Sequence, residues 1–97
     1  MRIVSFGDKS TREFYESGRL PKGKGWQSIG KVALRKLDMI SFTSGLGDLK
    51  VPPRNKLEAL KGSLEGFYSI RINRQWRVIF RYTDIGAEDV QIVDYHR

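Results

Sequence analysis

The sequence predicts an α+β fold in which N-terminal helices pack on one face of a twisted antiparallel β-sheet. Apolar residues recur at three- and four-residue spacing between residues 26 and 42, a pattern typical of an amphipathic helix. From Phe67 onward they alternate with polar residues, as in strands buried on one face. A chain of 97 residues supports one core, so residues 1–97 are expected to form a single domain.

The first two elements are expected to be a short strand and a short helix. Residues 2–7, RIVSFG, alternate weakly between apolar and polar side chains and predict a strand. Ser10 and Glu13 have the spacing of a capping box, which marks the start of a helix. This helix should begin near Ser10 and end at Gly18, because glycine readily adopts the left-handed conformation that closes a helix.

The second helix is expected within residues 26–42. Its core-facing side should carry the apolar residues Ile29, Val32, Ala33, Leu37 and Ile40. Its outer face should carry the basic residues Lys31, Arg35 and Lys36. Gly30 weakens the first turn by about 1 kcal/mol relative to alanine, which does not outweigh the apolar pattern.

The segment between this helix and the sheet is expected to be a loop followed by one helical turn. Pro52 and Pro53 favour an extended backbone. Asn55, with Glu58 three residues later, has the spacing of an N-cap. The sequence therefore predicts a helical turn over KLEALK, residues 56–61, closed by Gly62.

The first hairpin of the sheet is predicted by the parity of its apolar residues. If residues 73–75 form a three-residue loop, Ile72 faces Trp76 across the hairpin. All the apolar residues of one parity then share a face, namely Tyr68, Ile70, Ile72, Trp76, Val78, Phe80 and Tyr82. The opposite face carries Arg71, Arg77 and Arg81 and is therefore expected to be positively charged.

The last strand should extend both faces. The same parity places Val90 and Ile92 on the apolar side and Gln91, Val93 and Tyr95 on the basic side. It also places Tyr95 opposite Arg77. Asp94, Tyr95 and His96, near the end of the sequence, are therefore expected next to the arginine face.

Composition limits the possible functions. The formal net charge is +7 and the sequence pI is about 10.0, which favours a polyanionic partner such as nucleic acid. Solubility or an acidic protein partner explains the charge equally well. The absence of cysteine excludes disulfides and thiolate metal sites, and a single histidine argues against a transition-metal centre. We expect no cofactor, no membrane span, no secretory signal and a cytoplasmic location.

The chemical groups gathered on the basic face suit cleavage of RNA. Such cleavage needs a base for the 2′-OH proton, an acid for the leaving 5′-oxygen and cations around the phosphate. His96 has the pKa range for proton transfer, with Asp94 to orient it, while Arg77 and Lys61 supply charge. The alternative is that His96 is a frayed chain end and the arginines keep an exposed strand soluble. A nucleic-acid-binding module without chemistry fits the residues equally well.

The blocks PPRNKLEALKG, YSIRIN, QWRVIF and EDVQIVDYH resemble those of HigB-type toxins, in the same order and at similar spacing. These toxins belong to the RelE/ParE superfamily of type II toxin–antitoxin modules. The resemblance covers essentially the whole chain and is most specific from Val51 to His96. It implies the RelE-like fold and a ribosome-dependent endonuclease that cuts mRNA in the ribosomal A site, inhibits translation and arrests growth. It also implies a helix-turn-helix, HigA-like antitoxin encoded in the same operon.

The resemblance implies catalytic roles at five positions: Lys61, Arg77, Asp94, Tyr95 and His96. Four further basic residues, Arg54, Lys56, Arg71 and Arg81, are expected to bind RNA or the ribosome. Where some family members have a histidine, this chain has Glu58, which either replaces it as a proton acceptor or only caps a turn. No metal ligand is implied. The superfamily also contains ParE-like members that poison DNA gyrase, so gyrase inhibition is the alternative function.

Overall fold

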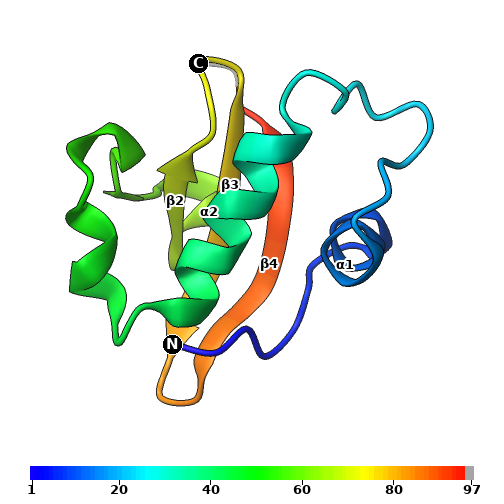
Figure 1. The fold of residues 1–97 in the computed structure, drawn as a ribbon. Coiled ribbons are helices and arrows are strands. Elements are labelled where there is room, and N and C mark those ends of the chain that lie inside the picture. Colours follow the sequence, from blue (N-terminus) through cyan, green and yellow to red (C-terminus); the bar gives the residue numbers. More distant parts are fainter. Residues whose placement is uncertain (96–97) are drawn as a thin grey trace.

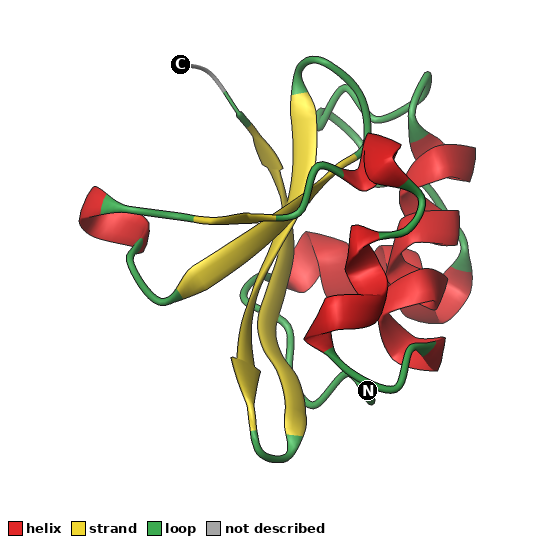
Figure 2. Ribbon diagram, turned by 90° about the vertical axis from the view of Figure 1, so that its left-hand side faces the viewer, coloured by secondary structure: helices red, strands yellow, loops and turns green. Residues whose placement is uncertain are grey.

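The computed structural model describes residues 1–95, which form two α-helices and a four-stranded antiparallel sheet. The helices are α1 (Lys9–Ser17) and α2 (Gly30–Phe42). The strands lie side by side in chain order: β1 (Glu58–Ala59), β2 (Phe67–Arg71), β3 (Trp76–Thr83) and β4 (Gly86–Asp94). Both α-helices lie on one side of the sheet (Figure 1, Figure 2), which confirms the predicted fold class.

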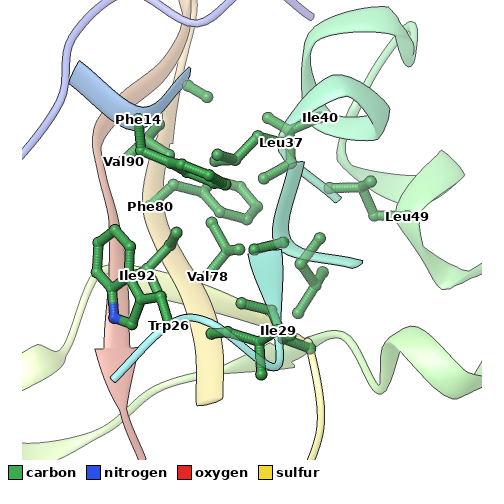
Figure 3. Packing of buried hydrophobic residues seen from close by; sticks show 14 residues of the cluster. Phe14, Trp26, Ile29, Leu37, Ile40, Leu49, Val78, Phe80, Val90 and Ile92 are labelled. Atoms are coloured by element: carbon green, nitrogen blue, oxygen red, sulfur yellow. The ribbon is translucent and has the colours of Figure 1, made fainter. Parts of the chain in front are cut away.

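The main core lies between α2 and the sheet. Leu37 and Ile40 of α2 are fully buried and pack in the same cluster as Val78 and Phe80 of β3 (Figure 3). Burying a side chain of this size contributes roughly 1.5–3 kcal/mol relative to leaving it exposed. The apolar face predicted for the helix is therefore the one that packs on the sheet. No helix within residues 1–95 has the length and apolar character needed to cross a membrane.

The N-terminal segment forms less regular structure than predicted. Residues 2–7 do not form a strand but make two isolated parallel bridges to β4, Ile3 with Ala87 and Phe6 with Val90. The segment thus covers part of the β4 edge, which would otherwise present unpaired backbone groups. Its close approach depends on Gly86, where φ is +139° and a Cβ atom would lie 2.3 Å from the Arg2 carbonyl oxygen.

The start of α1 differs from the predicted capping box. Asp8, with extended backbone angles, is the N-cap, and its Oδ1 atom accepts a hydrogen bond from the Thr11 backbone N–H at 2.8 Å. Ser10 already lies inside the helix, so it has the wrong backbone conformation to cap it. Gly18 closes α1 in the left-handed conformation, as predicted.

Lys36 was predicted to lie on the exposed face of α2, but in the structure it is buried. Its side chain is 6% exposed, and its Nζ atom donates a hydrogen bond to Oδ1 of Asn55. Position 36 lies four residues before Ile40 and three after Ala33, which is core-facing spacing, so only the charge of lysine favoured the outer face. Its partner Asn55 lies 19 residues further along the chain. A buried amine needs such a partner, since an unsatisfied polar group in the core is strongly unfavourable. Lys31 and Arg35 are exposed, as predicted.

We expect the burial of Lys36 to give protein stability an alkaline pH dependence. Burial, and secondarily the nearby charge of Arg35, lowers the pKa of Lys36 from its ordinary value of 10.5. In the pH range between the lowered pKa and 10.5, the unfolded chain binds more protons, so the free energy of unfolding should rise with pH. Denaturant unfolding of Lys36→Met across this range should lose that rise, whereas the exposed-residue control Lys31→Met should keep it. Equal pH slopes in wild type and Lys36→Met would contradict the expectation.

The helical turn predicted over residues 56–61 is absent. Glu58 and Ala59 form β1, paired with Ser69 and Tyr68 of β2. Asn55 does not cap a helix. It ends the short 3₁₀ helix η2 (Pro53–Asn55), which follows η1 (Leu46–Lys50), and its side chain is fully buried. Gly62 begins the 3₁₀ helix η3 (Gly62–Leu64) between β1 and β2.

The first hairpin has the predicted register and the second does not. Arg71 pairs with Arg77, and the Ile72 N–H donates to the Trp76 carbonyl oxygen at 2.9 Å, as expected for a loop of residues 73–75. In the second hairpin Val93, not Tyr95, lies opposite Arg77. The strands continue to a tight turn with Thr83 paired to Gly86, and an irregularity between Ile79 and Arg81 shifts the register. Opposite Arg77, β4 is displaced by two residues from the predicted register, with Val93 in the place of Tyr95. Because two is an even number, each β4 side chain stays on its predicted face there.

Candidate active site

The sheet face opposite the α-helices contains a cleft of about 740 Å³. It lies where β1, the β2–β3 hairpin and Tyr95, the residue after β4, meet. Eight side chains line it: Lys56, Leu57, Glu58, Arg71, Asn73, Arg74, Arg77 and Tyr95. Four of the eight are cationic and one is a carboxylate. The positive charge of the cleft favours an anionic ligand, and the carboxylate is a group that can accept a proton from it.

Arg77 is the fixed cation of this cleft. It is 6% exposed, although it belongs to the face that was expected to be open to solvent. Its Nη1 atom lies 2.9 Å from Glu58 Oε1, donates to the Lys56 carbonyl oxygen at 3.3 Å and donates to Ser69 Oγ. The guanidinium carbon also lies 5.0 Å from the centre of the Tyr95 ring. These contacts satisfy a buried charge and hold its position.

Sheet register brings Glu58 to Arg77. Glu58 pairs with Ser69 across β1 and β2, and Arg71 pairs with Arg77 across β2 and β3. Directly paired residues point to the same face, and Ser69 and Arg71 share that face because they are two residues apart. Glu58 therefore reaches Arg77 because residues 58–59 form a strand. A helical turn at this position would not have fixed this geometry.

A small apolar cluster adjoins the cleft on the same face. It consists of the buried residues Leu60, Phe67 and Ile79, with Leu64, Val93 and Tyr95 packed against them. Tyr95 thus contacts both the cluster and the Arg77 guanidinium. This packing explains why Arg77 and Ile79 are buried on a face that lies away from the helices.

Five predicted site residues are gathered at the cleft. Arg77, Tyr95 and the possible acid/base residue Glu58 line it together, along with the predicted RNA-binding residues Lys56 and Arg71. Their convergence was expected for Arg77, Tyr95 and Arg71. Tyr95 approaches Arg77 diagonally rather than from the directly opposite position, since its backbone N–H bonds to the Gln75 carbonyl oxygen.

The other predicted catalytic residues are placed differently. Lys61 is exposed at the N-terminal end of η3 and is not among the described residues that line the cleft. Asp94 pairs with Trp76 in the sheet, so its side chain has the parity of the helix-facing residues, and its Oδ2 atom accepts from Gln75 Nε2 at 3.0 Å. His96 lies outside the described residues.

Arg54 and Arg81 lie outside the cleft lining formed by residues 1–95. Arg81 is exposed, pairs with Asp89 at 3.2 Å and stacks over the Phe67 ring at 4.4 Å. Arg54 is exposed within η2. Both positions leave a cation available at the protein surface, which suits contacts to a phosphate backbone outside the cleft.

Two lining residues, Asn73 and Arg74, were treated in the sequence only as hairpin-loop residues. Their position at the end of β2, two and three residues after Arg71, was the signal that could have identified them. Asn73 Oδ1 accepts from the backbone N–H groups of Gln75 and Trp76, both at 2.8 Å, and so shapes the hairpin. Within residues 1–95, no group of three or more histidine, aspartate or glutamate side chains is placed to hold a metal ion.

A comparison with known families identifies the family of this chain. A family model described as "RelE-like toxin of type II toxin-antitoxin system HigB" matches residues 4–96. The chain belongs to this HigB family. The matched residues include β1, the β2–β3 hairpin and β4, which are the elements that form the cleft.

Individual HigB relatives cover most of the chain. Toxin HigB-1 of Vibrio cholerae is 36% identical over 85 residues, which is 84% of each protein. Endoribonuclease HigB of Proteus vulgaris is 31% identical over 94 residues, covering 97% of this chain and 99% of that protein. The chain is therefore a type II toxin of the HigB/RelE family.

Solved structures show the same architecture. The toxin chain in the YoeB–YefM complex from Staphylococcus aureus superposes with a TM-score of 0.55 at 22% identity, with both chains fully covered. The YoeB/ParE toxin from Agrobacterium tumefaciens superposes with a TM-score of 0.52, also at 22% identity and full coverage. At this identity the likeness establishes the RelE-like fold of the HigB-family chain.

Proposed function

We propose that this HigB-family toxin is a ribosome-dependent endoribonuclease that cuts mRNA in the ribosomal A site and thereby inhibits translation. The observation that carries the proposal is the pairing of Arg77 with Glu58 at 2.9 Å inside a cation-lined cleft. The name of the Proteus vulgaris relative, Endoribonuclease HigB, supports the same class of reaction. Beside holding the buried Arg77, the Glu58 carboxylate supplies a proton acceptor in the cleft, which cleavage of RNA requires and binding alone does not.

The proposed reaction is an attack of the ribose 2′-OH on the adjacent phosphate, without a metal ion. Glu58 takes the 2′-OH proton as the new oxygen–phosphorus bond forms. Arg77 exchanges its pairing with Glu58 for the phosphate oxygens and stabilises the negative charge that grows there. The bond from phosphorus to the 5′-oxygen then breaks, leaving a cyclic phosphate and a 5′-hydroxyl end.

The leaving 5′-oxygen needs a proton, which we assign to His96 on the basis of the family resemblance. Asp94 is proposed to orient that imidazole, and Tyr95 to stack against a base or donate its hydroxyl. Lys61, exposed at the N-terminal end of η3, is proposed to supply further positive charge to the bound RNA. The assignment of His96 completes the proton balance, because the proton that Glu58 takes at the 2′-oxygen is matched by the one that His96 delivers at the 5′-oxygen.

The remaining basic residues are proposed to bind RNA and the ribosome. Arg71, Arg74 and Lys56 line the cleft around Arg77, and Arg54 and Arg81 are exposed beyond it. Replacing any of these surface cations should weaken affinity in a salt-dependent manner, since each phosphate contact releases counterions.

Cleavage should require a translating ribosome. Purified protein is incubated with an mRNA, with and without programmed ribosomes, and the RNA ends are mapped by primer extension. We expect cuts within the A-site codon only when ribosomes are present, because the surface cations add ribosomal RNA contacts to those made in the cleft. Absence of cuts under both conditions, together with inhibited gyrase supercoiling, would assign the chain to the ParE-like function.

We also propose a cognate antitoxin, of helix-turn-helix type and encoded beside this chain. The Staphylococcus aureus structural neighbours come from YoeB–YefM toxin–antitoxin complexes, which supports an antitoxin partner for a chain of this fold. Expression of this chain alone should arrest bacterial growth, and co-expression of the neighbouring open reading frame should restore it. Arrest that is unaffected by either neighbouring reading frame would count against the module.

A further inference from the structure

A buried polar link joins α2 to the segment that borders the cleft. Lys36 of α2 donates from Nζ to Asn55 Oδ1, and both side chains are buried. The Asn55 Nδ2 atom donates to the carbonyl oxygens of Leu49 at 3.0 Å and Val51 at 3.4 Å. The Asn55 backbone N–H donates to the Pro52 carbonyl oxygen at 2.9 Å. Both ends of the Asn55 amide are therefore engaged, which fixes the side chain and the backbone around it.

The cleft begins one residue after this link. The Lys56 carbonyl oxygen accepts from Arg77 Nη1 at 3.3 Å, and Glu58 lies 2.9 Å from the same nitrogen. Lys56 has a φ of 45°, a left-handed conformation that a lysine adopts only when its surroundings impose it. Residues 56–58 therefore connect Asn55 to two of the three acceptors of Arg77 Nη1, the Lys56 carbonyl oxygen and the Glu58 carboxylate.

The stability of α2 alone does not account for a lysine at position 36. The neighbouring core-facing positions 33, 37 and 40 are Ala, Leu and Ile, and all are fully buried. An apolar side chain at position 36 and another at position 55 would avoid burying an amine and an amide. Burial lowers the pKa of Lys36, which reflects the unfavourable environment of its charged form. The pair is better explained by the position that it imposes on residues 55–58.

We infer that Lys36 and Asn55 are positioning residues of the active site, which hold residues 56–58 so that Arg77 is fixed between the Lys56 carbonyl and the Glu58 carboxylate. This inference rests on the proposed RNA cleavage for its catalytic meaning. The geometric part, that Lys36 fixes the Arg77 guanidinium, is testable without any substrate.

The test compares Lys36→Met with two controls. Lys31→Met removes an exposed lysine of the same helix, and Phe14→Leu weakens the core at α1, away from the link. The single-turnover cleavage rate is measured at saturating programmed ribosomes, alongside ribosome affinity. We expect Lys36→Met to lower the rate by about 10–10²-fold, the effect of a slight misplacement of reacting groups, with affinity nearly unchanged. Both controls should cut at close to the wild-type rate.

A second readout follows the Arg77 side chain by NMR. In the wild type its Nη1 hydrogens should be protected from exchange and rotation, because that nitrogen has Glu58, Lys56 and Ser69 as partners. Lys36→Met should broaden or shift these signals, and Phe14→Leu should leave them unchanged. In an Arg77→Ala background, adding Lys36→Met should lower the rate no further.

The outcomes separate this inference from the proposed function. A wild-type protein that cuts no RNA overturns the proposed function, and the Arg77 signals then decide whether Lys36 is a positioning residue. Unchanged Arg77 signals in Lys36→Met overturn the inference, whether or not the rate falls. If Lys36→Met does not fold, Asn55→Ser, which also removes the link, is measured in the same way with the same criteria.

Discussion

Replacing Arg77 with alanine should lower the single-turnover rate of RNA cleavage by about 10²–10³-fold, with ribosome affinity close to that of the wild type. Arg77 is held by Glu58, Ser69 and the Lys56 carbonyl before any substrate binds. A charge already in place only has to exchange its Glu58 partner for the phosphate oxygens, so little reorganisation is needed to stabilise the transition state. The measurement is a time course of cleavage at saturating programmed ribosomes, with thermal unfolding to show that the variant is folded.

The matched control for this variant is Arg12→Ala, which removes an exposed arginine of α1 on the other side of the sheet. Arg12→Ala should cut at the wild-type rate. Arg77→Lys should recover only part of the activity, because an ammonium group lacks the planar fork that binds two oxygens at once. A folded Arg77→Ala protein that cuts as fast as the wild type would remove Arg77 from the reaction.

Glu58→Gln should lower the cleavage rate by about 10²–10⁴-fold, the range for loss of a well-placed general base. Glutamine has nearly the same shape as glutamate and keeps an oxygen that can accept from Arg77, so the guanidinium should stay in place. It cannot take up the 2′-OH proton. The variant therefore separates proton transfer from positioning, and its rate is measured under the same single-turnover conditions.

Glu65→Gln is the control for this second variant, because Glu65 is an exposed carboxylate in the loop between β1 and β2. It should leave the rate unchanged. A Glu58→Gln protein with wild-type activity would show that Glu58 serves only to hold Arg77. The role of general base would then pass to His96, Asp94 or Tyr95.

The parts of the fold that depend on local sequence pattern were predicted well. The apolar stripe of α2 and the alternation of β2 and β3 are repeated over many residues, so a few exceptions did not change the result. The hairpin register followed from placing Ile72 opposite Trp76. It put Arg71 and Arg77 on one face, and that face proved to be the one with the cleft.

The errors occurred where distant contacts override local preference. Residues 56–61 contain good helix formers after an asparagine, but pairing with β2 makes residues 58–59 a strand. Lys36 has the spacing of a core-facing residue, but its charge favoured the outer face, and only a partner at position 55 shows how the amine is accommodated in the core. The offset of Tyr95 from Arg77 depends on a tight turn and a strand irregularity, which side-chain alternation does not encode.

These same errors concern the residues that build the site. Strand pairing at residues 58–59 brings Glu58 to Arg77. Asn55, the partner of the buried Lys36, lies three residues before Glu58 in the chain. The alternating pattern of the sheet identified the arginine but not its acidic partner. The contacts around Arg77 therefore depend on the tertiary structure more than on any single motif.

The central claim is that this cleft cuts RNA by activating the ribose 2′-OH. The most direct measurement is cleavage on programmed ribosomes of an mRNA with a single 2′-deoxy nucleotide immediately 5′ to the mapped scissile phosphate, beside the all-ribose mRNA. Wild-type protein should cut the all-ribose mRNA at that phosphate and leave the deoxy-substituted phosphate intact. Cutting of the deoxy-substituted mRNA at the same phosphate would contradict the claim.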